Sequence, residues 1–276
     1  MISAIMWNIN PAIFEGFELL RWYGVCWVLG IFLAYRIVLR IYRKEGIPED
    51  QLDHLVTYLM FGIIVGARLG HVLFYDPVHY WHNPIEILPF RIHPEFEYTG
   101  FAGLASHGGM IGALLALFLY SRKYQKDYLW LLDRLTIAGA ALGGFIRLGN
   151  LMNSEIIGIP TDVPWAFVFT RIDQVPRHPA QLYEAVFYFS LFLVLYFFHR
   201  SEKIKTLSGF TSGVGISMIF IQRFLIEFLK ENQVSFEENI VLNMGQTLSI
   251  PMILAGIVLI LVSFKTSPGR LPEQAN

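Results

Sequence analysis

Long apolar runs constrain this sequence more than any other feature. Seven stretches of about 20 residues are long enough to cross the hydrocarbon core of a bilayer as helices. They lie at Trp22–Ile41, Leu55–Tyr75, Phe101–Tyr120, Leu129–Leu148, Ala180–Phe198, Gly209–Leu229 and Gly245–Phe264. Only 16% of the 276 residues are charged, against about 25% in soluble domains. The sequence therefore predicts an all-α polytopic membrane protein with about seven transmembrane helices.

The connections between these runs differ in their content of Lys and Arg. Basic residues concentrate after the first, third, fifth and seventh runs and are sparse in the other connections. Because cytoplasmic connections carry the excess of Lys and Arg, we expect the N-terminus outside and the C-terminus in the cytoplasm. We expect one transmembrane domain over 1–276, with outer loops at 76–100 and 150–179. Within these loops, we expect Trp165–Phe169 and Ile87–Ile92 to form short strands or interfacial stretches. Long loops are commonly functional, so we expect the functional site on the outer side of the membrane.

Composition excludes several other classes of protein and site. The formal net charge of −1 lacks the excess of positive charge that is typical of nucleic-acid-binding proteins. Cys26 is the only cysteine, which excludes a disulfide framework or a multi-cysteine metal site. The spacing of His79, His82 and His93 matches no zinc pattern. We therefore expect neither a metal nor a cofactor. The first 19 residues contain no Lys or Arg, so no cleavable signal peptide is expected.

Polar side chains in and beside the apolar runs gather at one predicted depth. A charged side chain inside the membrane costs roughly 2.5–3.5 kcal/mol, so each one needs a reason. Those at outer-leaflet depth come from six different runs: Tyr23, Arg68, His71, His107, Arg147, Asn150, Asn153, Glu155, His178, Gln181, Glu184, Arg223 and Glu227. Because these side chains are expected at the same depth in the membrane, we predict that they line a common pocket. The alternative is that helix ends simply carry polar side chains that reach the interface.

The stretch from Arg147 to Gly158 is the most informative motif. Arg147, Asn150 and Asn153 would share one face of a continuing helix. A guanidinium with adjacent carboxamides suits a phosphodiester and a hydroxylated head group. Glu155 could orient the arginine or accept a proton. The alternative is a hydrogen-bonded network that only ends the helix.

Three weaker motifs accompany it. His107 precedes Gly108 near a helix start, where glycine permits close approach of a ligand and histidine can take a proton near neutral pH; the alternative is a glycine-mediated helix contact. Arg223 and Glu227 are neighbours on one helix face, which by itself is more often a structural pair. His178 projects just before the helix whose first turn holds a proline.

Together these motifs resemble those of the bacterial prolipoprotein diacylglyceryl transferases. The resemblance rests on Arg147-x-Gly-Asn-x-x-Asn-x-Glu-x-x-Gly158, His107-Gly-Gly109, His178-Pro-Ala-Gln-Leu-Tyr-Glu184 and Arg223-Phe-x-x-Glu-Phe228. It implies an enzyme of the bacterial cytoplasmic (inner) membrane, with its active site at the outer leaflet. The implied reaction transfers the diacylglyceryl group of phosphatidylglycerol to the lipobox cysteine of prolipoprotein signal peptides, forming a thioether and releasing glycerol phosphate.

The resemblance and the motifs give a set of expected roles. We expect catalytic roles for His107, Arg147, Glu155 and Arg223, and substrate contacts from Arg147, Asn150, Asn153, Tyr23, Gly108, Gly158, Glu227 and His178. In this hypothesis the two arginines clamp the phosphate, and His107 is the general base with Glu155 as the second candidate. The alternative function is a non-catalytic membrane carrier of lipids or anions, although such carriers commonly show paired repeats. A serine hydrolase is disfavoured because no Gly-x-Ser-x-Gly motif occurs.

Overall fold

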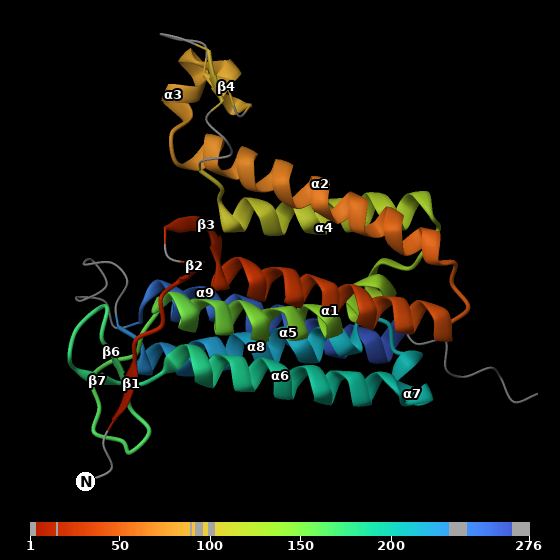
Figure 1. Cartoon of the computed structure of the whole chain (residues 1–276). Coiled ribbons are helices and arrows are strands. Elements are labelled where there is room, and N and C mark those ends of the chain that lie inside the picture. The colour runs from red at the N-terminus through yellow and green to blue at the C-terminus, as the bar shows by residue number, and fades with distance from the viewer. Residues whose placement is uncertain are drawn as a thin grey trace, which may run out of the picture. The chain divides into compact units, whose positions relative to one another are not determined.

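The computed structural model describes residues 4–14, 16–88, 90–91, 96–98, 103–231 and 242–266. The long helices are α1 (Trp22–Lys44), α2 (Glu49–Phe74), α4 (Ser106–Lys123), α5 (Tyr128–Asn153), α6 (Ala180–His199), α8 (Phe210–Ile226) and α9 (Met244–Thr266) (Figure 1). The short ones are α3 (Pro77–His82), η1 (Pro84–Ile87), α7 (Glu202–Lys205) and η2 (Glu227–Leu229). The chain divides into two compact units: Met1–Arg40 with Leu132–Asn276, and Ile41–Leu131.

The helices confirm a multi-pass helical membrane protein. Six are long and apolar enough to cross a bilayer, namely α1, α2, α5, α6, α8 continued by η2, and α9. The third expected run, Phe101–Tyr120, also forms a helix, but α4 starts only at Ser106 and carries Arg122 and Lys123 in its last turn, so it is not among the six. The prediction of seven spans and of their orientation stays a prediction.

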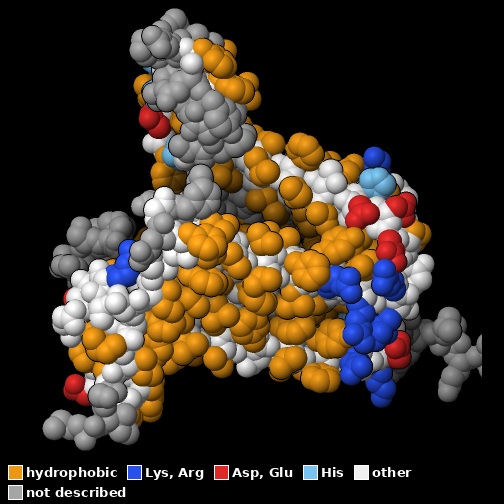
Figure 2. All heavy atoms as spheres, in the orientation of Figure 1, with side chains coloured by type: hydrophobic (Ala, Val, Ile, Leu, Met, Phe, Trp, Pro, Cys, Tyr) orange, Lys and Arg blue, Asp and Glu red, His pale blue; other side chains and the backbone are white. Residues whose placement is uncertain are grey.

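Side-chain distribution on the surface agrees with this class. Figure 2 shows hydrophobic side chains over the sides of the helices, with Lys and Arg gathered towards the end near α7. Large apolar side chains of α9 such as Leu254, Ile257 and Leu261 are exposed, which suits contact with lipid chains. Small residues let helices approach closely: a Cβ on Gly213 of α8 would lie 2.7 Å from the carbonyl oxygen of Gly256 in α9.

A buried carboxylate at one end of α5 fixes the start of α8. The carboxylate of Asp133, which is 4% exposed, accepts hydrogen bonds from the backbone N–H groups of Gly209 (2.8 Å) and Ser212 (2.7 Å) and from the Ser212 hydroxyl (2.7 Å). Gly209 is the residue before α8 and caps the helix with no side chain of its own. Asp133 therefore supplies from α5 the cap that α8 lacks.

Removal of this cap should destabilise the protein. We expect Asp133→Ala to lower the free energy of unfolding by about 3 kcal/mol, because it leaves buried N–H donors without an acceptor. Asp127→Ala is the matched control, since Asp127 caps α5 at an exposed site through the Trp130 N–H and should cost only about 1 kcal/mol. Denaturation in detergent measures both. Equal losses for the two variants would contradict the capping role of Asp133.

Short strands form outside the long helices, although the predicted fold class is all-α. Strands β1 (Ile5–Trp7), β6 (Phe167–Phe169) and β7 (Pro176–Arg177) make one small sheet, in which β1 is parallel and β7 antiparallel to β6 (Figure 1). Strands β2 (Ala12–Phe14) and β3 (Phe17–Arg21) form a hairpin, and β4 (Phe90–Arg91) pairs with β5 (Glu97–Tyr98).

The expected strand segments are confirmed in part. The expected segment Trp165–Phe169 contains β6, and the expected segment Ile87–Ile92 contains β4, whereas Ile92 lies outside the described residues. The same is true of 89, 93–95, 99 and 100 in the predicted loop 76–100. The three-stranded sheet packs its phenylalanines against Leu151 and Ile157, which ties the 150–179 segment to the end of α5.

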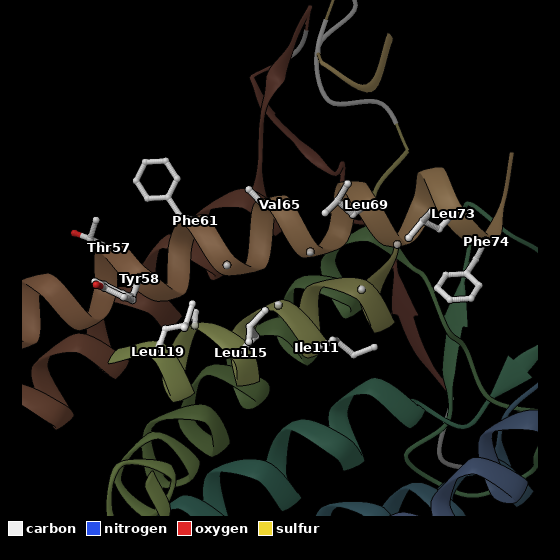
Figure 3. Close-up of a pocket in the computed structure, with 16 residues that line it drawn as sticks. Thr57, Tyr58, Phe61, Val65, Leu69, Leu73, Phe74, Ile111, Leu115 and Leu119 are labelled. Atoms are coloured by element: carbon white, nitrogen blue, oxygen red, sulfur yellow. The ribbon is translucent and has the colours of Figure 1, made fainter. Parts of the chain in front are cut away.

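In the second unit, α2 and α4 pack through glycines. Gly66 and Gly70 of α2 face Gly108 and Gly112 of α4 so closely that no Cβ would fit at these positions. Beside this contact runs an apolar groove of about 580 Å³, walled by Phe61, Leu69 and Leu73 on α2 and by Ile111, Leu115 and Leu119 on α4 (Figure 3). This close contact is the glycine-mediated packing that the sequence offered as the alternative reading of the His107 motif.

Arg68 joins α2 to the segments on either side of β4 and β5. Its guanidinium donates to the carbonyl oxygens of Ile87 (2.8 Å), Gly103 (3.2 Å) and Glu86, and lies 5.1 Å from the ring centroid of Tyr80. Arg68 is 7% exposed, and these backbone acceptors account for its burial.

Candidate active site

The end of α5 and the turn after it bring Asn150, Asn153 and Glu155 together. After Asn153 the backbone turns through Ser154, whose φ of 55° is left-handed. The N–H of Glu155 donates to the Asn150 carbonyl, and the N–H of Ser154 donates to the Leu151 carbonyl (both 3.0 Å). This is the Schellman arrangement, which normally uses glycine where Ser154 stands. The turn folds Glu155 back over the last turn of α5, at some cost in backbone strain.

A hydrogen-bonded chain results from this turn. The Arg147 Nη1 donates to Asn150 Oδ1 (3.3 Å), and Asn150 Nδ2 donates to Glu155 Oε2 (3.3 Å). The other oxygen of Glu155 accepts from Asn153 Nδ2 (3.0 Å). The helix-face argument thus grouped Arg147, Asn150 and Asn153 correctly. Glu155 holds the two asparagines directly and reaches Arg147 through Asn150.

A second, more deeply buried group lies on the other side of Arg147. Its Nε is in ionic contact with Glu184 Oε2 at 3.2 Å, without the direction of a hydrogen bond. Glu184 Oε1 accepts from Lys230 Nζ (3.1 Å), which also donates to Glu227 Oε1 (3.3 Å). The Glu184 and Lys230 side chains are 1% and 3% exposed. Glu227 Oε2 accepts from Asn243 Nδ2 (3.1 Å).

Arg223 is the cation of this region without a described carboxylate partner. The sequence suggested a structural pair between Arg223 and Glu227, but both oxygens of Glu227 bind other groups, Lys230 and Asn243. Within the described ranges no hydrogen bond or ion pair engages the Arg223 guanidinium. The Tyr188 hydroxyl interacts with Arg147, Glu184 and Arg223, so Arg223 lies near the ionic cluster. No described residue accepts a hydrogen bond from its five N–H donors, and such a guanidinium is suited to bind an anion.

Gly158 lies where three backbone segments meet. Its N–H donates to the His178 carbonyl (3.0 Å), and the residue pairs with Lys230 in an isolated β-bridge. A Cβ at Gly158 would lie 2.6 Å from His178 Cβ and 2.8 Å from the Leu229 carbonyl oxygen. Gly158 therefore holds the Lys230 segment in place, and the His178 ring lies beside it, with Nδ1 3.2 Å from the Tyr183 hydroxyl.

Arg177 also holds the segment that contains Lys230, through hydrogen bonds to Gly158 and Glu231. It donates to both oxygens of Asp173, to the Gly158 carbonyl and to Glu231. These hydrogen bonds hold the pKa of Asp173 below its ordinary value. The Asp173 carboxylate therefore stays charged through neutral and mildly acidic pH, and the contribution of this pair to stability is lost only as the pH falls through that lowered pKa.

Tyr23 at the start of α1 packs beside the Arg147 motif. A Cβ on Gly149 would lie 2.8 Å from Tyr23 Cδ2 and 3.4 Å from Cys26 Cβ. Gly149 precedes Asn150, so the tyrosine ring lies against the turn of α5 that carries the carboxamide. This contact gives the glycine of the motif a packing role.

Enlarging Gly149 should therefore displace Tyr23. We expect Gly149→Ala to lower kcat/KM of the reaction that the resemblance implies by about tenfold, since small misplacements of site groups are costly. The thermal midpoint in detergent should change little, because the ring can shift. Gly139→Ala on the same helix is the matched control, because nothing lies within 4 Å of its added Cβ. If both variants keep wild-type kinetics, Tyr23 does not need its observed position.

His107 and Gly108 belong to the second compact unit. His107 is the second residue of α4 and is exposed, and it has no hydrogen bond or ion pair to any other described residue. Gly108 is buried against Gly66 and Gly70 of α2. Helix packing is thus a sufficient reason for glycine at 108, while its predicted contact with substrate stays a prediction, as does the role of His107 as a base.

Sequence reasoning missed the centre of the ionic cluster. Lys230 and Asn243 are not among the expected site residues, because neither belongs to a local motif. Glu184 and Gln181 were noted at the start of their helix, but without partners. Gln181 is fully buried, and its Nε2 donates to the Glu155 carbonyl. The signal that points to Lys230 is charge balance: two carboxylates in apolar runs, Glu184 and Glu227, require a cation nearby.

Comparison with known proteins places these residues in a family. The sequence profile described as prolipoprotein diacylglyceryl transferase matches residues 11–262. The chain is 50% identical to the phosphatidylglycerol–prolipoprotein diacylglyceryl transferase of Bacteroides fragilis over 261 residues, covering 93% of this chain and 94% of the relative. Identity to the protein of that name from Tolumonas auensis is 47% over 263 residues, covering 95% and 98%. On these grounds, the chain belongs to the prolipoprotein diacylglyceryl transferase family.

Proposed function

We propose that this protein transfers the diacylglyceryl group of phosphatidylglycerol to the lipobox cysteine thiol of prolipoproteins. Similarity over nearly the whole chain to transferases of that name carries the proposal. The site supports it, because an arginine held by a carboxylate and a carboxamide lies near a second arginine that no described carboxylate engages. That is a donor set suited to one phosphodiester group.

The proposal includes the membrane arrangement. We place seven spans, with α4 as the shortest, the N-terminus outside and the C-terminus in the cytoplasm of a bacterial inner membrane. The distribution of Lys and Arg supports this orientation. The ends of α5 and α8 that carry Arg147 and Arg223 then lie at the outer leaflet, where a secreted prolipoprotein would present its cysteine.

The reaction is a displacement at carbon. The cysteine sulfur forms a bond to the glyceryl carbon, and the bond from that carbon to the phosphate oxygen breaks, with its electron pair leaving on glycerol phosphate. Arg147 and Arg223 stabilise the charge that develops on the leaving phosphate. Asn150 and Asn153, held by Glu155, bind the hydroxyl groups of the glycerol head group, and Tyr23 closes that side.

A base must also take the thiol proton, because a free cysteine has a pKa of about 8.5. His107 is the first candidate and Glu155 the second. His107→Asn should lower kcat by about 10²–10³-fold, because the group that accepts the thiol proton is lost. A fully active His107→Asn variant would assign the proton to another group, and the rate of Glu155→Gln would test that carboxylate.

Product analysis tests the function as a whole. Purified protein in phosphatidylglycerol vesicles is incubated with a signal peptide that carries a lipobox cysteine, and with the same peptide bearing serine instead. Diacylglyceryl-modified cysteine peptide together with stoichiometric glycerol phosphate is the expected result. Lipid movement between vesicle leaflets without either product would identify the alternative, a lipid carrier, and would overturn the proposal.

A further inference from the structure

A groove of about 350 Å³ lies between α6 and α8 in the unit that carries the ionic cluster. Its walls are Tyr183 and Phe187 from α6 and Met218, Ile221, Leu225 and Leu229 from α8 and η2. All of these side chains are apolar or aromatic. Leu225 and Met218 are 59% and 42% exposed, so the groove opens to the surroundings of the helices, which in a membrane are lipid chains.

One end of this groove lies next to the candidate active site along the chain. Tyr183 directly precedes Glu184, and Leu229 directly precedes Lys230. The Tyr183 hydroxyl accepts a hydrogen bond from Trp165 Nε1 (2.7 Å) and lies 3.2 Å from His178 Nδ1. The groove therefore ends within one residue of the ionic cluster on both of its walls.

The length of the groove matches one leaflet. Met218 and Leu229 are eleven residues apart, which is about 16 Å along a helix, and half of a bilayer core is about 15 Å. The groove beside α2 and α4 (Figure 3) extends from Thr57 to Phe74, about 25 Å, and contains no residue of the ionic cluster. The α6–α8 groove is therefore the one with the dimensions of a single chain of an outer-leaflet lipid.

We propose that the groove between α6 and α8 holds one acyl chain of the diacylglyceryl donor. This inference rests on the proposed function, since it takes the donor to be phosphatidylglycerol. The groove then selects for chain length, because each methylene buried in it contributes a factor of about four in binding.

Filling the groove separates this proposal from a general loss of activity. We expect Leu225→Trp to lower kcat/KM about tenfold or more for dipalmitoyl phosphatidylglycerol and by less than about twofold for the dihexanoyl lipid, which has too few methylenes to fill the groove. Leu254→Trp on α9 is the matched control: Leu254 is 58% exposed, against 59% for Leu225, and lies outside the groove. It should change neither value. An equal loss on both lipids, or no loss on either, would overturn the proposal.

Photo-crosslinking reads out binding without turnover. Benzoylphenylalanine in place of Leu225 or of Leu254 is irradiated with alkyne-tagged dipalmitoyl phosphatidylglycerol in vesicles. Labelling at position 225 should exceed labelling at 254, and added unlabelled lipid should compete it. Equal labelling at both positions means contact with bulk lipid and overturns the groove assignment. Failure of the wild-type protein to form thioether would refute the proposed function, whereas this labelling would still report on the groove.

Discussion

Arg147→Lys should lower kcat/KM for diacylglyceryl transfer by about 10²–10³-fold while the protein remains folded. Lysine keeps the positive charge beside the buried Glu184 carboxylate, which Arg147 contacts at 3.2 Å, so the ionic cluster stays balanced. Lysine lacks the planar guanidinium of arginine, which donates to Asn150 and keeps further N–H donors for two oxygens of a phosphate. The measurement is the initial rate of thioether formation on a lipobox peptide, with the thermal midpoint in detergent as the check on folding.

Arg171→Lys is the matched control for this substitution. Arg171 lies on the 150–179 segment that follows Arg147 in the chain, and it is exposed, so the change from guanidinium to ammonium should leave both rate and midpoint unchanged. The clamp hypothesis fails if Arg147→Lys retains most of the wild-type rate. A rate loss accompanied by an equally large fall in the midpoint would instead assign Arg147 a structural role.

Lys230→Met should lower the free energy of unfolding by about 3–5 kcal/mol, because it leaves Glu184 and Glu227 short of a buried cation. The Lys230 side chain is 3% exposed and the Glu184 side chain 1%, so water cannot replace the lost partner. Lys203→Met removes an exposed lysine and should change stability by less than about 0.5 kcal/mol. Unfolding in mixed detergent micelles measures both variants.

A second substitution shows whether the loss comes from unpaired charge. Glu184→Gln in the Lys230→Met background removes the carboxylate that lost its cation, and we expect the double variant to regain about 1–2 kcal/mol over Lys230→Met. Additive losses would mean that Lys230 acts through packing alone. The recovered stability should not restore transfer, since a neutral carboxamide at position 184 no longer provides the negative charge that orients Arg147 Nε.

Local patterns predicted those parts of the protein that depend on neighbours along the chain. Apolar runs of bilayer length predicted the long helices, because a backbone in lipid must satisfy its hydrogen bonds within each segment. The helical repeat brought Arg147 to Asn150, three residues away and observed at 3.3 Å. The same argument suggested an Arg223–Glu227 pair, and there it was wrong, because Glu227 finds partners outside its own helix.

The sequence by itself determined the class of protein, the positions of the long helices and the family, since hydropathy and contiguous motifs survive without knowledge of contacts. Only the tertiary structure decided which charges neutralise one another: Lys230 lies between Glu184 and Glu227, which are 46 and 3 residues away. A buried ion is placed by the whole set of opposite charges that reach it, and that set comes from α6, η2 and the segment after it. Pairing across such distances depends on how the helices assemble, which no local spacing records.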